Sequence, residues 1–198
     1  MAVGYGLAPS ANGAQDRDCA GVCFWPILAN SLEQPRPLQP PDSHHLQAAT
    51  GWLELGDHLE ANEELEKITP SLRAHPDALW IRHRIYEKAG KWAVCCDVAQ
   101  TLTVLTPHHG AAWVSLSIAQ FRLGRTQEAL ETLQAKVSEF GYDWRVPYNL
   151  ACYACQLGQL REAEQYLHKA IVLGDENEVR RSIMEDPDLE PLRSEFRL

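Results

Sequence analysis

Cysteine and histidine are the residue types whose spacing in this chain could support chemistry. Cys152 and Cys155 form a Cys-x-x-Cys pair, and Cys19 and Cys23 form a second spaced pair. A redox pair of this kind needs its first cysteine exposed at a helix N-terminus, where the dipole lowers the thiol pKa. Because apolar residues precede Cys152 in a helical pattern, packing in a core is the favoured interpretation. A metal or redox role for Cys152 and Cys155, with the other pair as further zinc ligands, is the alternative.

The other motifs of enzyme chemistry are missing from the sequence. The chain has eight histidines, but it contains no His-Glu-x-x-His motif and no two histidines four residues apart. It also contains no glycine-rich phosphate loop and no Gly-x-Ser-x-Gly elbow. The sequence therefore predicts surface or capping histidines, no enzymatic activity, no cofactor and no metal site.

The charge balance and the hydropathy pattern narrow the class of partner. With 18 basic and 27 acidic side chains the formal net charge is -9, which argues against nucleic acid as the main partner. No window of 18 apolar residues occurs, so we expect no membrane span. The first basic residue is Arg17 and follows Asp16, which is unlike a secretory signal. We therefore expect a cytoplasmic protein with reduced thiols.

A repeat of constant length organises the chain after the first 43 residues. The glycines Gly56, Gly90, Gly124 and Gly158 are each 34 residues apart. Small residues recur five positions after three of them, at Ala61, Ala129 and Ala163, where the second unit has Cys95. Seven positions before the glycine stand Ala49, His83, Ser117 and Ala151. This register predicts a helix, a turn at glycine and a second, antiparallel helix that packs closely on the first.

The expected elements and boundaries follow from this register. First helices are expected at about 44–55, 77–89, 111–123 and 145–157, and second helices at about 58–74, 91–105, 127–139 and 161–173. The four units are 44–75, 76–109, 110–143 and 144–174. Residues 1–43 hold half of the prolines and are expected to form an irregular leader, and 175–198 a capping helix with an acidic tail. Pro70 should kink or shorten the first of the second helices.

The residues of the units resemble a known repeat. The third unit carries Trp113-Val114-Ser115-Leu116-Ser117 and then Leu123-Gly124-Arg125-Thr126-Gln127-Glu128-Ala129. The fourth carries Asn149-Leu150-Ala151 and then Leu157-Gly158-Gln159-Leu160-Arg161-Glu162-Ala163. These units resemble the tetratricopeptide repeat, and the body also resembles small bacterial proteins of this kind. The resemblance implies an all-α fold, an α-solenoid of four antiparallel helix pairs plus a C-terminal capping helix. It departs most in the second unit, at His83 and Cys95, which puts the spacing of that helix pair in doubt.

In this repeat family, ligands lie in a concave groove lined by positions five, nine, twelve and thirteen of each unit. Carried over to this chain, these positions are Leu46, Thr50, Leu53 and Glu54 in the first unit, Trp80, Arg84, Glu87 and Lys88 in the second, Val114, Ile118, Phe121 and Arg122 in the third, and Tyr148, Cys152, Cys155 and Gln156 in the fourth. Among them, the residues expected to line the partner-binding groove are Trp80, Arg84, Lys88, Val114, Ile118, Phe121, Arg122, Tyr148, Cys152 and Gln156. The lysine and asparagine that clamp a C-terminal carboxylate in some members are replaced here. The groove is therefore apolar and aromatic, with the three basic side chains as anion contacts.

We accordingly expect a non-enzymatic protein–protein interaction module, a scaffold or adaptor, that binds a peptide or helix of an unidentified partner. Self-association into a homo-oligomer, or occupation of the groove by the leader around Trp25, fits an apolar groove as well as an external partner does.

Overall fold

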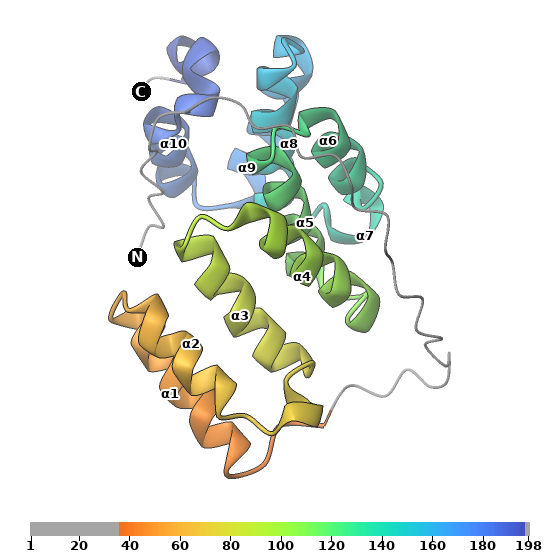
Figure 1. Cartoon of the computed structure of the whole chain (residues 1–198). Helices are drawn as coiled ribbons and strands as arrows, with labels where there is room; N and C mark the ends of the chain where they lie inside the picture. The colour runs from red at the N-terminus through yellow and green to blue at the C-terminus, as the bar shows by residue number, and fades with distance from the viewer. Residues whose placement is uncertain (1–35, 197–198) are drawn as a thin grey trace. The chain divides into compact units, whose positions relative to one another are not determined.

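The computed structural model describes residues 36–196, and these residues form helices and no strand (Figure 1). The first helices of the four pairs are α1 (Asp42–Glu54), α3 (Pro76–Lys88), α5 (Gly110–Arg122) and α8 (Arg145–Gln156). The second helices are α2 (His58–Glu66), α4 (Trp92–Leu105), α6 (Thr126–Gln134) and α9 (Leu160–Leu173). The predicted all-α stack of four helix pairs is confirmed. Most of the predicted leader, with Trp25, Cys19 and Cys23, lies outside the described residues.

The four glycines of the repeat make the turn inside each pair. Gly56, Gly90, Gly124 and Gly158 have φ of 87°, 68°, 77° and 76°, in the left-handed region that L side chains avoid. After each of them the chain folds back on the helix it has left. The amide of Asp57, for example, donates to the carbonyl oxygen of Trp52 at 2.9 Å. Glycine is therefore required for the backbone conformation at these four positions.

Small side chains lie where the two helices of a pair meet. In the first, third and fourth pairs the facing positions are Ala49 and Ala61, Ser117 and Ala129, and Ala151 and Ala163, all fully buried. In the second pair the thiol of Cys95 lies 3.8 Å from the carbonyl oxygen of His83. The Cys95 side chain of α4 therefore reaches the backbone of α3 at this position.

The first and third of the second helices end early. Helix α2 ends at Glu66 and a 3-10 turn, η1 (Pro70–Leu72), follows it, so the shortening predicted from Pro70 is confirmed. Pro70 cannot donate a helical hydrogen bond, and Arg73 donates to the carbonyl oxygens of Glu66 and Ile68 at the end of α2. The continuous helix predicted at 127–139 is wrong, because α6 ends at Gln134 and a short helix, α7 (Val137–Phe140), follows.

The helix pairs stack on one another through their second helices. Helix α2 packs against α3, α4 against α5, and α6 against α8. At the C-terminal end, α10 (Glu176–Glu185) packs on α9, and a 3-10 segment, η2 (Pro187–Phe196), packs on α8 and α10. Val179 and Ile183 of α10 and Leu189, Leu192 and Phe196 of η2 are buried in the core that α8 and α9 share. The capping helix predicted within residues 175–198 is α10, while the residues after it, expected to form an acidic tail, bury apolar side chains.

No helix in the described part of the chain is long and apolar enough to cross a membrane.

Candidate functional site

The groove positions of the second unit lie on α3 and combine an anchored aromatic ring with exposed cations. The Trp80 ring is half-buried and lies against the His109 ring at the start of α5, with 5.4 Å between the centroids. Arg84 and Lys88 are one helical turn apart and exposed. Neither forms an ion pair within residues 36–196. Their charges are therefore available to an incoming ligand.

The groove positions of the third unit lie on α5 and differ in accessibility. Val114 is 9% exposed and belongs to the core. Ile118 and Phe121 are half-buried, and the Phe121 ring contacts the Tyr153 ring with 4.9 Å between centroids. The guanidinium of Arg122 lies 5.8 Å from the centroid of Phe121 and 5.9 Å from that of Trp92. Its cation is thus held beside two aromatic faces, which retains the charge at a defined place.

The groove positions of the fourth unit, on α8, are engaged by the chain's own C-terminal segment. The Tyr148 hydroxyl donates to Oδ2 of Asp186 at 3.0 Å, and the Cys152 thiol donates to the same oxygen at 3.7 Å. The Gln156 amide donates to the carbonyl oxygen of Asp188 at 2.9 Å. Of these three side chains, Cys152 is buried, Tyr148 is half-buried and Gln156 remains exposed.

The contacts between α8 and residues 186–188 place acidic groups in a partly dehydrated environment. Burial raises the pKa of Asp188, Asp186 raises it further, and the Arg122 charge opposes both effects. Burial, together with the neighbouring Cys152 and Asp186, also raises the pKa of Tyr148, which keeps the phenol protonated and able to donate. Burial therefore disfavours the ionised carboxylate of Asp188 where this segment meets α8.

The Cys-x-x-Cys pair lies inside α8 and not at its N-terminus. Cys152 and Cys155 are each 5% exposed. Burial raises the pKa of both thiols, and the nearby Asp186 and Asp188 raise it further, so the reactive thiolate is disfavoured. Within residues 36–196 no three side chains of cysteine, histidine or acidic type gather as a metal site would require. These features favour packing for both cysteines.

The histidines mostly lie at the surface or at helix ends, with one exception. His75 caps α3 by accepting the Asp77 amide at 3.2 Å, and His45 contacts Glu64 of α2 at 3.0 Å. His83 instead is 4% exposed, and its Nε2 has no hydrogen-bond partner. The sequence shows that His83 replaces the small residue of the other units. It does not show that Nε2 of His83 is buried without a hydrogen-bond partner.

The contact of α8 with η2 and its preceding turn was not predicted from the sequence. Asp186 and Asp188 fall in the segment predicted as an acidic tail. A signal was present in the spacing of Leu189, Leu192 and Phe196, which are three and four residues apart, as on one face of a helix. Prolines at 187 and 191 obscured that signal because they argue against a regular helix.

Solved structures resemble the described fold at low sequence identity. One is the structure of MamA from Desulfovibrio magneticus RS-1, which comprises residue 41 to the end of that protein. Its sequence is 18% identical to this chain, the TM-score is 0.64, and the alignment covers 81% of this chain and 93% of that one. A thermophilic TPR protein of Thermus thermophilus is 21% identical with a TM-score of 0.64, over 78% of this chain and 85% of that one. No family model and no curated protein sequence matches the chain. Residues 36–196 therefore have the tetratricopeptide-repeat fold, an α-solenoid of four helix pairs with α10 and η2 closing its C-terminal end.

Proposed function

We propose that the chain is a non-enzymatic interaction module that binds an acidic segment, a peptide or a helix, of a partner protein. The binding site comprises the accessible groove positions on α3 and α5, namely Trp80, Arg84, Lys88, Ile118, Phe121 and Arg122. Tyr148 and Cys152 are excluded from it because Asp186 engages them, and Gln156, although exposed, is left out because its amide is hydrogen-bonded to Asp188. Val114 supports the site from within the core.

The observation that carries this proposal is the pair of exposed, unpaired cations Arg84 and Lys88 next to partly exposed aromatic rings. Aromatic and arginine side chains dominate the binding energy at protein interfaces. An acidic ligand gains from cations that have no internal partner to give up. The engagement of Asp186 by Tyr148 and Cys152 supports the same conclusion, because it is an acidic segment of this chain held on the equivalent face of α8.

Charge reversal on α3 tests the proposal. The full chain, used as bait, should capture a partner that mass spectrometry identifies. The double variant Arg84→Glu, Lys88→Glu should lose that partner by at least tenfold in recovered amount. Both side chains are exposed, so circular dichroism should be unchanged. Trp80→Ala and Phe121→Ala should weaken capture through lost apolar contact.

A matched control is available on α9. Arg161 and Lys169 are also exposed, and reversing both changes the net charge by the same amount at a distance from the groove positions. Arg161→Glu, Lys169→Glu should therefore capture the partner as the unmodified chain does. Equal loss in both double variants would show that net charge alone governs capture, and no loss in either would exclude α3 from the site.

A further inference from the structure

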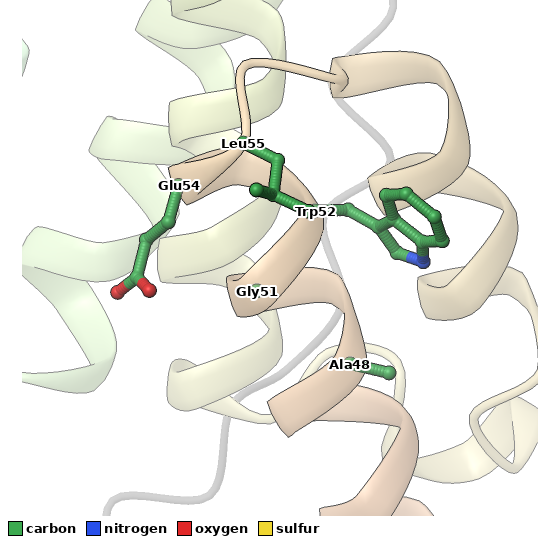
Figure 2. Close-up of a pocket in the computed structure, with 5 residues that line it drawn as sticks. All are labelled: Ala48, Gly51, Trp52, Glu54 and Leu55. Atoms are coloured by element: carbon green, nitrogen blue, oxygen red, sulfur yellow. The ribbon is translucent and has the colours of Figure 1, made fainter.

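The two ends of the helix stack differ in whether their apolar faces are covered. At the C-terminal end, α10 and η2 bury the apolar face of the last pair. At the N-terminal end, the outer face of α1 carries apolar side chains that no described element covers: Leu55 is 78% exposed and Trp52 is 37% exposed. Together with Ala48, Gly51 and Glu54 they line an open depression of about 450 Å³ (Figure 2). The terminal units of helical solenoids normally present a polar outer face, so this end departs from the rule.

In the other three helix pairs, the face equivalent to this one is covered by a helix. The residues that follow Gly51 at intervals of 34 are Ile85, Ala119 and Tyr153, and they are 3%, 0% and 1% exposed. In each case the second helix of the preceding pair packs on the helix that carries them. The face of α1 is therefore equivalent to three helix-covered faces.

Gly51 adds an independent reason to place a helix there. Glycine inside a helix costs about 1 kcal/mol relative to alanine. A Cβ atom at this position would meet nothing within 4 Å, so packing inside the chain does not call for glycine. Close approach of another helix across Ala48 and Gly51 does call for small residues.

We propose that a second copy of this chain covers the face, with α1 packed antiparallel on α1 of its partner about a two-fold axis midway between Ala48 and Gly51. The charges of α1 favour this occupant. Glu54 lies in the last turn, which contains no basic residue, where the helix dipole opposes a negative charge. In the antiparallel pair, Glu54 lies beside the first turn of the partner's helix, near the exposed His44 and the positive end of that dipole.

The capped C-terminal end limits the assembly to two copies. A head-to-tail filament would need an uncovered face at both ends of the stack, and Val179, Ile183 and Leu189 close one of them. Because each copy contributes mainly one helix, the interface belongs to the size class of weak, reversible complexes. This pairing is separate from the groove positions on α3 and α5.

The test measures mass in solution. Light scattering on the full chain, across a concentration series, should approach twice 22.3 kDa at high concentration and fall on dilution. Leu55→Glu should remain at 22.3 kDa throughout, since it places a charge in the apolar contact. Val172→Glu, at a side chain of α9 that is 82% exposed, should dimerise as the unmodified chain does.

A covalent trap gives a second readout. The double variant Ala48→Cys, Gly51→Cys should form a disulfide-linked dimer under mild oxidation, because the two-fold axis brings Ala48 of one copy beside Gly51 of the other. Val172→Cys should not. A monomer at every concentration, a dimer that persists in Leu55→Glu, or equal cross-linking in the cysteine variants of α1 and of Val172 would each overturn the proposed pairing.

Discussion

His83 occupies the position at which the other three helix pairs carry alanine or serine. Its ring is buried between α3 and α4, with Nε2 unpaired and the Trp80 ring against its edge at 6.4 Å between centroids. Burial lowers the pKa of His83 from 6.5 to about 4, since the charged form would lose its hydration. The folded chain thus holds a neutral imidazole where the unfolded chain would bind a proton.

Stability should therefore fall as the pH drops below 6.5, because the unfolded state gains a proton at His83 before the folded state does. The stabilising effect of the neutral ring is complete above pH 6.5 and is lost as the pH falls towards 4. Between pH 7 and about pH 5 the free energy of unfolding should decrease by roughly 2 kcal/mol because of His83. In His83→Ala this contribution to the decrease should disappear. Urea unfolding at both pH values measures the free energy of unfolding of each chain.

An exposed histidine provides the control for this prediction. His108 lies at the surface, with 75% of its side chain accessible. His108→Ala should lose as much stability on acidification as the unmodified chain. If His83→Ala also does so, the account of a buried neutral ring is wrong.

The thiols of Cys152 and Cys155 should react slowly in the folded chain. Both are buried and both have a raised pKa, so little thiolate is accessible to an electrophile. Labelling with a maleimide at neutral pH, followed by peptide mass spectrometry, should show modification of the peptide from α8 only after denaturation. Cys96, which is half-buried, is the internal comparison. Rapid labelling of Cys152 in the native chain would revive a redox role.

At the scale of elements, the C-terminal segment is a structural cap and not a loose tail. Leu189 is fully buried among α8, α9 and α10. Truncating a buried leucine to alanine costs about 2–5 kcal/mol through lost transfer energy and the cavity left behind. Leu189→Ala should therefore lower the free energy of unfolding by about that amount. Glu190→Ala, at the exposed neighbouring position, should change it by less than about 0.5 kcal/mol. Chemical denaturation of both variants decides the matter, and equal stabilities would mean that η2 is not part of the fold.

The sequence predicted the helices well where the repeat specifies both their start and their end. First helices begin and end within about two residues of prediction, because the glycine turn and the small facing residues recur at a constant spacing. Second helices were less predictable because their ends depend on contacts that vary between units. Arg73 reaches back to the end of α2, and Phe140 packs against Gly110 at the start of α5.

The candidate site was predictable in position but not in accessibility. Counting from the glycines places Trp80, Arg84 and Phe121 on the first helices. Val114 lies in the core, and Tyr148 is hydrogen-bonded to Asp186. Both facts depend on contacts between segments distant in the sequence. A periodic pattern predicts which face a residue lies on, and it carries no information about a non-repeating segment that covers that face.

At the scale of the whole molecule, the stack divides into an accessible part, α3 and α5, and a part closed by the chain itself, α8 with η2. The charge distribution agrees with this division. The chain carries a net charge of -9, yet the groove positions of α3 and α5 include three basic side chains, Arg84, Lys88 and Arg122, against one acidic side chain, Glu87. Binding to an acidic partner should accordingly weaken as salt concentration rises, since salt screens exposed charges.

Hydrogen–deuterium exchange of the full chain, with and without its captured partner, tests directly whether α3 and α5 form the binding site. On binding, exchange should slow in peptides from α3 (Pro76–Lys88) and α5 (Gly110–Arg122) and stay unchanged in α8 and η2. Protection confined to α8, or faster exchange in η2 as the partner displaces it, would show that the partner binds elsewhere on the stack.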